Sequence, residues 1–173
     1  MKNIIFKSIL VFIISFICPG SYAMELKSSA FKNNEIISKL YTCDGKDISP
    51  PLNWNDIPEK TKSLALICDD PDAPAGTWVH WVVYNIKSAS KELPAKIPHQ
   101  ETMSNGAKQG INDFGKIGYG GPCPPVGTHR YFFKLYALDS MLDLEPGATK
   151  KQLLQAMEGH VLAETELIGK YKR

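Results

Sequence analysis

The sequence lacks an excess of charge of either sign. It carries 20 basic and 18 acidic side chains, for a formal net charge of +2 over 173 residues. Without the first 23 residues, which contain Lys2 and Lys7 and no acid, the two signs balance. Nucleic acids and anionic membrane surfaces are bound through concentrated basic patches. We therefore expect neither as the main partner, and we expect the basic run at 170–173 to be a solvated tail.

Cysteine is scarce, and its spacing excludes a familiar metal site. No CxxC pair and no His/Cys pattern typical of zinc is present, so the sequence predicts no metal and no cofactor. Cys18 lies in the N-terminal segment, which leaves Cys43, Cys68 and Cys123 for the rest of the chain. In an exported protein these three allow one disulfide and one thiol, or three thiols.

An apolar run long enough to span a membrane comfortably is missing as well. Lys2 and Lys7 flank the start of a short apolar run at 9–17, which is followed by a Pro-Gly pair and by Ser-Tyr-Ala at 21–23. This layout is typical of a secretory signal peptide, whereas a retained membrane anchor needs a longer run. We expect residues 1–23 to be removed and residues 24–173 to be exported, to the periplasm or beyond, without a stable membrane anchor.

The mature chain consists mainly of strand-like segments. Its 43% hydrophobic and 22% charged composition is ordinary for one globular domain with a core. Short segments that suit edge strands come first, and a polar irregular stretch separates the central predicted strands from the C-terminal ones. The large apolar side chains of Leu52 and Trp54 are expected in the core. The predicted strands lie at 24–31, 35–40, 63–68, 79–86, 130–138 and 161–171, with the irregular stretch at 87–111.

One segment has a helical pattern. Thr149 is a plausible N-cap, Leu153, Leu154 and Met157 fall on one face, and Gly159 is a natural stop. Regular helices do not separate the strands, which argues against a βαβ fold. We therefore predict a mainly β fold, a β-sandwich of two sheets with few short helices.

Two stiff loops hold most of the polar residues that could form a site. The first, at 69–78, places three carboxylates and two prolines between two predicted strands. The second, at 118–130, is rich in glycine and proline and leads into another strand. Proline fixes φ and removes a backbone donor, so both loops hold their side chains in place. Two rigid, polar loops at strand ends predict one shared site.

The residues of these loops favour an anion site. Asp70 and Asp72 lie two residues apart, His80 lies inside a strand, and His129 lies just before one. Imidazoles donate hydrogen bonds, and loop amides next to Gly121 can form an anion-binding nest. The alternative for each residue is structural: the acids accept backbone donors of their own turns, and His80 is a satisfied core group.

Taken together, these motifs resemble the phosphatidylethanolamine-binding protein family, in its bacterial Raf-kinase-inhibitor-like branch. The resemblance covers nearly the whole mature chain. The motifs behind it are Asp-Pro-Asp-Ala-Pro at 70–74, Thr-Trp-Val-His-Trp at 77–81, Asn-Asp-Phe-Gly at 112–115, Gly-Gly-Pro-Cys-Pro-Pro at 120–125 and His-Arg-Tyr at 129–131.

The resemblance implies a β-sandwich with a small pocket at one end for phosphate-like anions and phospholipid headgroups. It assigns one wall of the pocket to Asp70, Asp72, Trp78 and His80, and the other to Gly121, Pro122, His129 and Tyr131. The imidazoles would donate to a phosphate or carboxylate, while the acids would orient them or meet a ligand amine. Because two uncompensated carboxylates would repel a phosphate, at least one acid must be paired. We thus predict an exported, non-catalytic binding protein.

Two other functional classes remain open. A hydrolase could use Cys123 with His129 as a nucleophile and base, or the Asp and His groups for acid–base hydrolysis. Against the first form, Cys123 lies between two prolines and away from a helix N-terminus that would activate its thiol. An inhibitor or adaptor could use the same pocket to recognise an anionic side chain of a partner protein.

Overall fold

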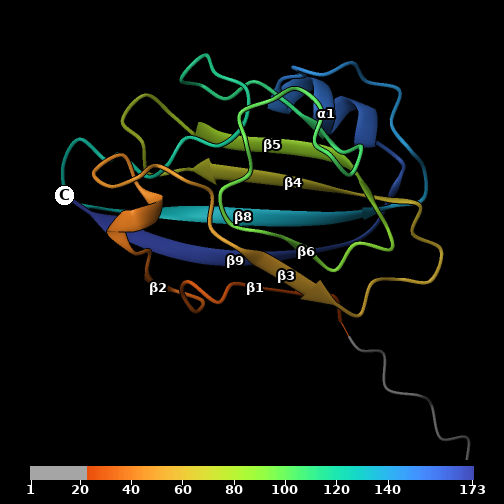
Figure 1. The fold of residues 1–173 in the computed structure, drawn as a ribbon, viewed down its shortest axis with the longest axis horizontal. Helices are drawn as coiled ribbons and strands as arrows, with labels where there is room; N and C mark the ends of the chain where they lie inside the picture. Colours follow the sequence, from red (N-terminus) through yellow and green to blue (C-terminus); the bar gives the residue numbers. More distant parts are fainter. Residues whose placement is uncertain (1–22) are drawn as a thin grey trace, which may run out of the picture.

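Two β-sheets pack face to face (Figure 1). The structure is a computed structural model that describes residues 23–173, so the predicted signal peptide lies outside the described residues except for Ala23. The larger sheet has six strands in the order β2-β9-β8-β4-β5-β7, and the smaller has three in the order β1-β3-β6. The predicted mainly β sandwich is confirmed.

The first four strands alternate between the two sheets, β6 returns to the smaller sheet after β5, and the last three strands lie in the larger sheet. All strand pairs are antiparallel except β2 with β9. Their bounds are β1 (Glu25–Lys27), β2 (Glu35–Ile36), η1 (Lys39–Tyr41), β3 (Leu52–Asn55), β4 (Ser63–Asp70), β5 (Trp78–Lys87), β6 (Glu92–Leu93), β7 (Lys108–Gln109), β8 (Thr128–Leu138), α1 (Lys150–Met157) and β9 (Val161–Lys172).

The main core fills the space between the sheets. Leu52 and Trp54 of β3 face the larger sheet and are buried, as predicted from the sequence. The indole nitrogen of Trp54 donates to the carbonyl of Ser90 at 2.9 Å, so the polar atom of this large side chain is satisfied despite its burial.

Strand β4 is buried along its whole length because both of its faces are covered. Leu66 and Cys68 face the smaller sheet, whereas Ala65 and Ile67 pack in a second apolar cluster beneath α1. Side chains alternate between the faces of a strand. The two acids at the end of β4, Asp69 and Asp70, therefore leave the sheet on opposite sides.

The predicted helix is present, with the predicted beginning and end. Thr149 and Gln152 form a capping box, and Gly159 follows the helix with a φ of 77°. Leu153 and Met157 are buried against the sheet, but Leu154 is 41% exposed, so the apolar face is narrower than predicted.

Three predictions need correction. The edge strands predicted at 24–31 and 35–40 are reduced to β1 and β2, and the irregular stretch at 87–111 contains the short strands β6 and β7. The C-terminal run is not a solvated tail: β9 extends to Lys172, and Tyr171 and Arg173 both donate to Asp44. These contacts link residues far apart in sequence, which local patterns do not reveal.

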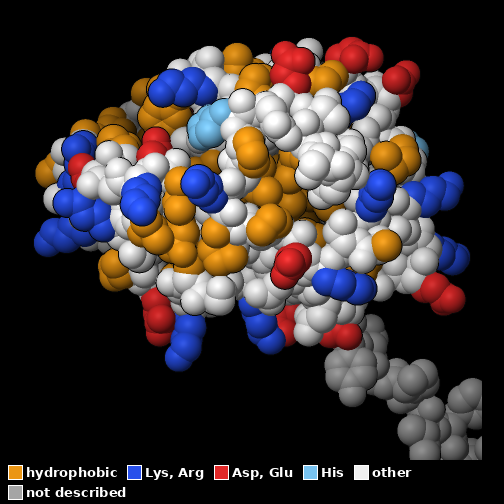
Figure 2. All heavy atoms as spheres, viewed as in Figure 1, with side chains coloured by type: hydrophobic (Ala, Val, Ile, Leu, Met, Phe, Trp, Pro, Cys, Tyr) orange, Lys and Arg blue, Asp and Glu red, His pale blue; other side chains and the backbone are white. Residues whose placement is uncertain are grey.

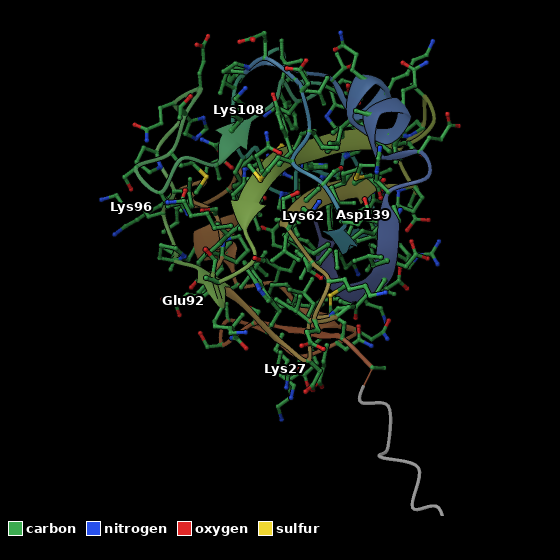
Figure 3. The ribbon with its side chains drawn as sticks, turned by 90° about the vertical axis from the view of Figure 1, so that its right-hand side faces the viewer. Lys27, Lys62, Glu92, Lys96, Lys108 and Asp139 are labelled. Carbon is green, nitrogen blue, oxygen red and sulfur yellow. A yellow bond between two sulfur atoms is a disulfide. The ribbon has the colours of Figure 1, made fainter. Side chains whose placement is uncertain are left out.

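Figure 3 views the end of the sandwich where β4 begins and β8 stops. Lys62 and Asp139 lie together there, and the amide of Lys62 donates to the carbonyl of Leu138 at 2.8 Å. β4 runs from this end to the opposite end, and the antiparallel β8 runs back from it (Figure 1). The opposite end contains the candidate site described next. Within 23–173, no helix is long and apolar enough to cross a bilayer.

Candidate functional site

A cavity of about 310 Å³ lies where β4 ends and where β5 and β8 begin. The loops predicted to share a site do meet here, since both contribute to the lining. The lining residues are Asp70, Ala73, Pro74, Ala75, Trp78, His80, Phe114, Cys123, Pro124, Pro125 and His129.

A larger groove of about 490 Å³ lies beside α1, but its lining has different chemistry. It contains no histidine, and its two carboxylates, Asp113 and Glu158, belong to exposed residues. The smaller cavity, in contrast, contains Asp70, His80 and His129, all of which are buried. Buried ionisable groups that line a cavity mark it as the better candidate.

Asp70 and His129 form a buried pair at the base of this cavity. Nδ1 of His129 lies 2.7 Å from Oδ2 of Asp70, and the two side chains are only 8% and 5% exposed. The second oxygen of Asp70 accepts the backbone amide of Asp72 at 2.8 Å. The carboxylate thus fixes the orientation of the ring and leaves Nε2 of His129 for a ligand.

His80 is held by a different partner. Its Nδ1 lies 2.6 Å from the carbonyl oxygen of Gly120, and a carbonyl can only accept, so Nδ1 bears the hydrogen. The ring meets Phe114 and Tyr131 edge-on at centroid distances of 5.4 and 5.1 Å. Burial lowers the pKa of His80 below its usual value of 6.5. In the neutral ring, Nε2 is an acceptor; on protonation it becomes a donor.

Two further polar groups at this site have no hydrogen-bond partner within the described part of the chain. They are the indole nitrogen of Trp78 and the hydroxyl of Tyr131, both fully buried atoms. Burial and the nearby Asp70 carboxylate raise the pKa of Tyr131, so its hydroxyl stays protonated. Buried polar groups are rarely left unsatisfied, and of the two only Trp78 lines the cavity, so its indole nitrogen is the candidate donor to a ligand.

Asp72 lies outside the lining and has a structural partner. The guanidinium of Arg130 donates to both carboxylate oxygens of Asp72, from Nε at 2.9 Å and from a terminal nitrogen at 2.7 Å. The backbone amide of Arg130 donates to the same carboxylate. These hydrogen bonds lower the pKa of Asp72 to about 2. The Asp72–Arg130 ion pair fastens the first loop to the start of β8. Both acids of the loop are therefore paired.

Gly121 and Pro122 also lie outside the lining. The amide of Gly121 donates to Asp47 at 2.7 Å and the amide of Gly120 donates to the carbonyl of His80 at 2.9 Å, so these two amides are not free to form the predicted nest. A Cβ on Gly121 would lie 2.5 Å from the carbonyl oxygen of Tyr41. Glycine is needed here for close packing of the wall rather than for anion binding.

The wall behind Gly121 is tied to the rest of the protein by a disulfide. Cys43 and Cys123 are bonded across 80 residues, and Cys68 is a buried free thiol. The amide of Cys43 also donates to the carbonyl of Pro122 at 3.1 Å. The question that the sequence left open is settled as one disulfide and one thiol.

The sequence from residue 27 to residue 172 matches the family described as phosphatidylethanolamine-binding protein. The chain belongs to the phosphatidylethanolamine-binding protein family. It is 57% identical over 150 residues to a UPF0098 protein of Methanothermobacter thermautotrophicus, a match that covers 87% of this chain and 99% of that protein.

Two solved structures of the phosphatidylethanolamine-binding protein family are similar to this one. The first is a putative homolog from Chlamydia trachomatis, CT736, with a TM-score of 0.81 and 46% identity over 87% of this chain and 98% of that one. The second is Escherichia coli YbcL, described as a member of the mammalian family, with a TM-score of 0.82 and 32% identity over 88% of this chain and 99% of that one.

In this member of the phosphatidylethanolamine-binding protein family, the predicted site residues fall into three groups. Asp70, Trp78, His80 and His129 line the cavity, Tyr131 packs against His80, and Asp72, Gly121 and Pro122 support the walls. Sequence reasoning missed Phe114, which lies in the Asn-Asp-Phe-Gly motif and lines the cavity. Within residues 23–173, no group of three or more histidine, cysteine, aspartate or glutamate side chains could hold a metal ion.

Proposed function

We propose that this protein is an exported, non-catalytic binding protein whose cavity takes a small phosphate-like anion or a phospholipid headgroup. The proposal deepens the family assignment, which by itself indicates a binding protein of unspecified ligand. We further propose that it belongs to the bacterial Raf-kinase-inhibitor-like branch, on the motifs quoted above.

The observation behind the proposal is the buried Asp70–His129 pair beside a second buried imidazole. In His129, Nδ1 is bound to Asp70, and in His80 it is bound to Gly120, so each ring has only Nε2 left for a ligand. Both rings line the same cavity. Two oriented ring nitrogens at one cavity suit a ligand that offers two oxygens, one of which bears a proton when His80 is neutral.

The charges around the cavity support an anionic ligand. Asp70 is hydrogen-bonded to His129 and to the amide of Asp72, and Asp72 is paired with Arg130, so neither carboxylate lies beside the cavity without a partner. The indole nitrogen of Trp78, a residue that lines the cavity, adds a hydrogen bond that a phosphate can accept. With His80 neutral, its Nε2 suits a ligand that still has a hydroxyl, such as a protonated phosphate, or an ammonium group.

The disulfide supports export. Disulfides form and persist in oxidising compartments, such as the bacterial periplasm, and are rare in the cytosol. The Cys43–Cys123 bond is therefore consistent with removal of a signal peptide at residues 1–23 and with a periplasmic or secreted mature protein. Mass spectrometry of the mature N-terminus would test this part directly, with Met24 as the expected first residue.

The hydrolase alternative loses its nucleophile in this structure. Cys123 is bonded to Cys43, so it offers no thiol to His129. A water-based hydrolysis would need a group that activates the water, and His129 is the obvious candidate because Asp70 orients it. Turnover of phosphate esters that stops in His129→Gln would contradict the non-catalytic proposal.

Calorimetric titration with inorganic phosphate, O-phosphorylethanolamine and acetate tests the proposal. We expect saturable binding by the mature protein and binding at least about 30-fold weaker in His129→Gln, since a charge-assisted hydrogen bond is lost. His160→Gln is the matched control, because His160 pairs with Asp139 on the surface, away from the cavity. Equal melting temperatures would show that both variants are folded.

An absence of binding by the folded wild type would contradict the proposal. The remaining function would then be an inhibitor or adaptor that recognises a partner protein through the cavity. Binding that is the same in His129→Gln and wild type would also contradict it, because the ligand would then bind elsewhere.

A further inference from the structure

One edge of the larger sheet is open. Strand β9 is paired with β8 along its whole length, but on its other side it meets only β2, opposite Gly169 and Lys170. Among the strands of residues 23–173, none pairs with residues 162–166 on that side. We call residues 162–166 the open edge. An unpaired strand edge is a template on which another strand can form.

The open edge is accessible and lies away from the candidate cavity. The cavity lies where β8 begins, whereas β9 begins opposite the last residue of β8, in the pair Leu138–Val161. In Figure 1, β9 is the lowest of the long strands, and Figure 2 shows acidic and basic side chains along the lower border of the protein in the same view. Leu162 is 39% exposed, so no other element covers this edge.

The backbone groups of the open edge point away from β8. The carbonyl oxygen of Ile168 accepts the amide of Asn34, on the side opposite to β8, at 2.7 Å. Backbone groups of every second residue in a strand point to the same side. Those of Glu164 and Glu166 therefore point outward as well, beyond the reach of β2, and remain available to an added strand.

A groove flanks the open edge on each face of the sheet. The groove towards the smaller sheet measures about 580 Å³, and no basic residue of 23–173 lines it. Its lining residues are Ala23, Met24, Asp56, Ile57, Pro58, Leu162, Ala163 and Glu164. The groove on the outer face measures about 370 Å³ and is lined by Lys134, Tyr136, Glu164, Thr165 and Glu166. Since side chains alternate between the faces of a strand, those of an added strand would enter the two grooves in turn.

The acidic side chains of the open edge have no basic partner. Glu164 and Glu166 lie on the outer face, opposite Tyr136 and Lys134 of β8. Within residues 23–173 neither acid forms an ion pair, and Lys134 is bound to Asp69 instead. Burial and the carboxylates of Glu164 and Asp69 raise the pKa of Tyr136 to about 12. The outer groove thus offers two unpaired negative charges to a partner.

The same two acids argue against a second copy of this chain as the partner. If two open edges paired in antiparallel register about residue 164 or 165, an acid of one copy would lie opposite an acid of the other. Like charges directly opposite each other destabilise a strand pair, whereas opposite charges stabilise it. The edge therefore favours a basic strand over its own copy.

We propose that the open edge binds an extended segment of a partner protein by strand addition, and that this segment carries basic residues at alternate positions with apolar residues between them. The basic side chains meet Glu164 and Glu166 on the outer face. The apolar side chains enter the groove between the sheets, beside Met24 and Ile57. Main-chain hydrogen bonds provide affinity, and the alternating side chains provide specificity. The inference is independent of the proposed function, because no residue of the open edge lines the cavity.

Fluorescence anisotropy with a labelled, end-capped seven-residue peptide of alternating valine and lysine tests the proposal. We expect saturable binding by the mature protein, and binding at least about tenfold weaker in Glu164→Lys/Glu166→Lys, because like charges then face each other. The matched control is Glu101→Lys/Glu145→Lys, which changes the net charge equally at exposed residues on the β7 side of the sheet. The control should bind as wild type does. No binding by wild type, or equal binding by all three proteins, would overturn the proposal.

Two N-methylated forms of the peptide separate strand addition from charge attraction. Both forms keep every lysine, but one is methylated at the valine amides and the other at the lysine amides. An added strand turns only one of these two sets towards β9. One form should therefore bind wild type at least about tenfold more weakly than the other. Equal binding of the two forms would overturn strand addition, and this test requires no variant of the protein.

Hydrogen exchange locates the peptide and tests the alternative partner. The amides of Glu164 and Glu166 should exchange rapidly in the free protein and at least about tenfold more slowly with the peptide bound. Unchanged exchange at both amides in the complex would overturn the proposal, because the peptide would then bind elsewhere. Slow exchange in the free protein, together with a dimer in sedimentation velocity, would assign the open edge to a second copy of this chain instead.

Discussion

Two neighbouring acids, Asp69 and Asp70, end the same strand and serve different purposes. Asp69 faces the α1 side of the sheet, where Lys134 and Lys150 both donate to its carboxylate. Asp70 faces the other side, where it meets one imidazole and lines the cavity. Both are buried, so burial alone does not separate a structural acid from a functional one.

The difference lies in what each partner leaves free. Two lysines surround Asp69, and Asp69 lines neither the groove beside α1 nor the candidate cavity, so we assign its pairing a structural role. Asp70 instead orients His129, and the ring still has an unused nitrogen that borders empty space. A buried charge pair becomes a candidate site when one member still has a free polar atom at a cavity.

The largest expected effect concerns the disulfide on the cavity side. Replacing both Cys43 and Cys123 with serine should lower the free energy of unfolding by about 3–4 kcal/mol, because the bond closes a long loop in the unfolded chain. The two cysteines are 80 residues apart. Urea unfolding of wild type, with and without dithiothreitol, and of the double variant measures this. A reductant effect that persists in the double variant would contradict the assignment to this bond.

The next effect concerns Asp69. Asp69→Asn should lower the free energy of unfolding by about 2 kcal/mol, because two lysines then lose their shared counter-ion. The value is below that of a fully buried pair, since Lys134 and Lys150 are 32% and 24% exposed. Affinity for O-phosphorylethanolamine should stay within about twofold of wild type. A large loss of affinity would break the distinction between the two acids.

Asp70→Asn should show the opposite pattern. We expect about 20-fold weaker binding of O-phosphorylethanolamine, or about 1.8 kcal/mol, because a charged partner of His129 is replaced by a neutral one. Asparagine keeps an oxygen for the amide of Asp72, so the free energy of unfolding should fall by no more than about 1 kcal/mol. Calorimetry and urea unfolding of both acid variants, side by side, measure these effects. Loss of ligand binding in Asp69→Asn but not in Asp70→Asn would reverse the structural and functional roles assigned to the two acids.

The smallest effect is a pH dependence due to His80. Burial lowers the pKa of His80, so the folded protein takes up this proton only below pH 6.5. Between pH 7.5 and 5, sulfate, whose charge is constant, should bind about fivefold more tightly as Nε2 becomes a donor. Over the same range the ligand-free protein should lose stability, because the unfolded chain binds the proton more readily than the folded one.

His80→Gln isolates this effect. The variant should lose most of the pH dependence of sulfate binding and of unfolding, whereas His160→Gln should keep both. Calorimetry and urea unfolding at pH 7.5, 6.5, 5.5 and 5.0 would provide the comparison. An unchanged pH profile in His80→Gln would assign the dependence to another group, with His129 the next one to test.

Much of the fold was predictable because its signals are local. The apolar and aromatic runs of the long strands, the Thr149 cap and the Gly159 stop depend on residues within a few positions of each other, and the structure confirms the strands and the helix. Short strands such as β6 were missed because two residues do not make a pattern. The exposure of Leu154 was not predicted, because the width of the buried face of a helix depends on which elements cover it.

The candidate site was predictable in part. The two loops pointed to Asp70, His80 and His129, and the family resemblance added Trp78; all four line the cavity. The roles of Asp72 and Gly121 were not predictable, because the partners that occupy them, Arg130 and Asp47, are 58 and 74 residues away.

The long strands, the helix, the two stiff loops and the family could all be predicted from the sequence. Which acid lines the cavity, which amides are already bonded and which cysteines pair depends on tertiary packing. The reason is physical: a period of two tells that Asp69 and Asp70 face opposite sides of a strand, but only the packing of α1 and the smaller sheet on those sides decides which one borders a cavity.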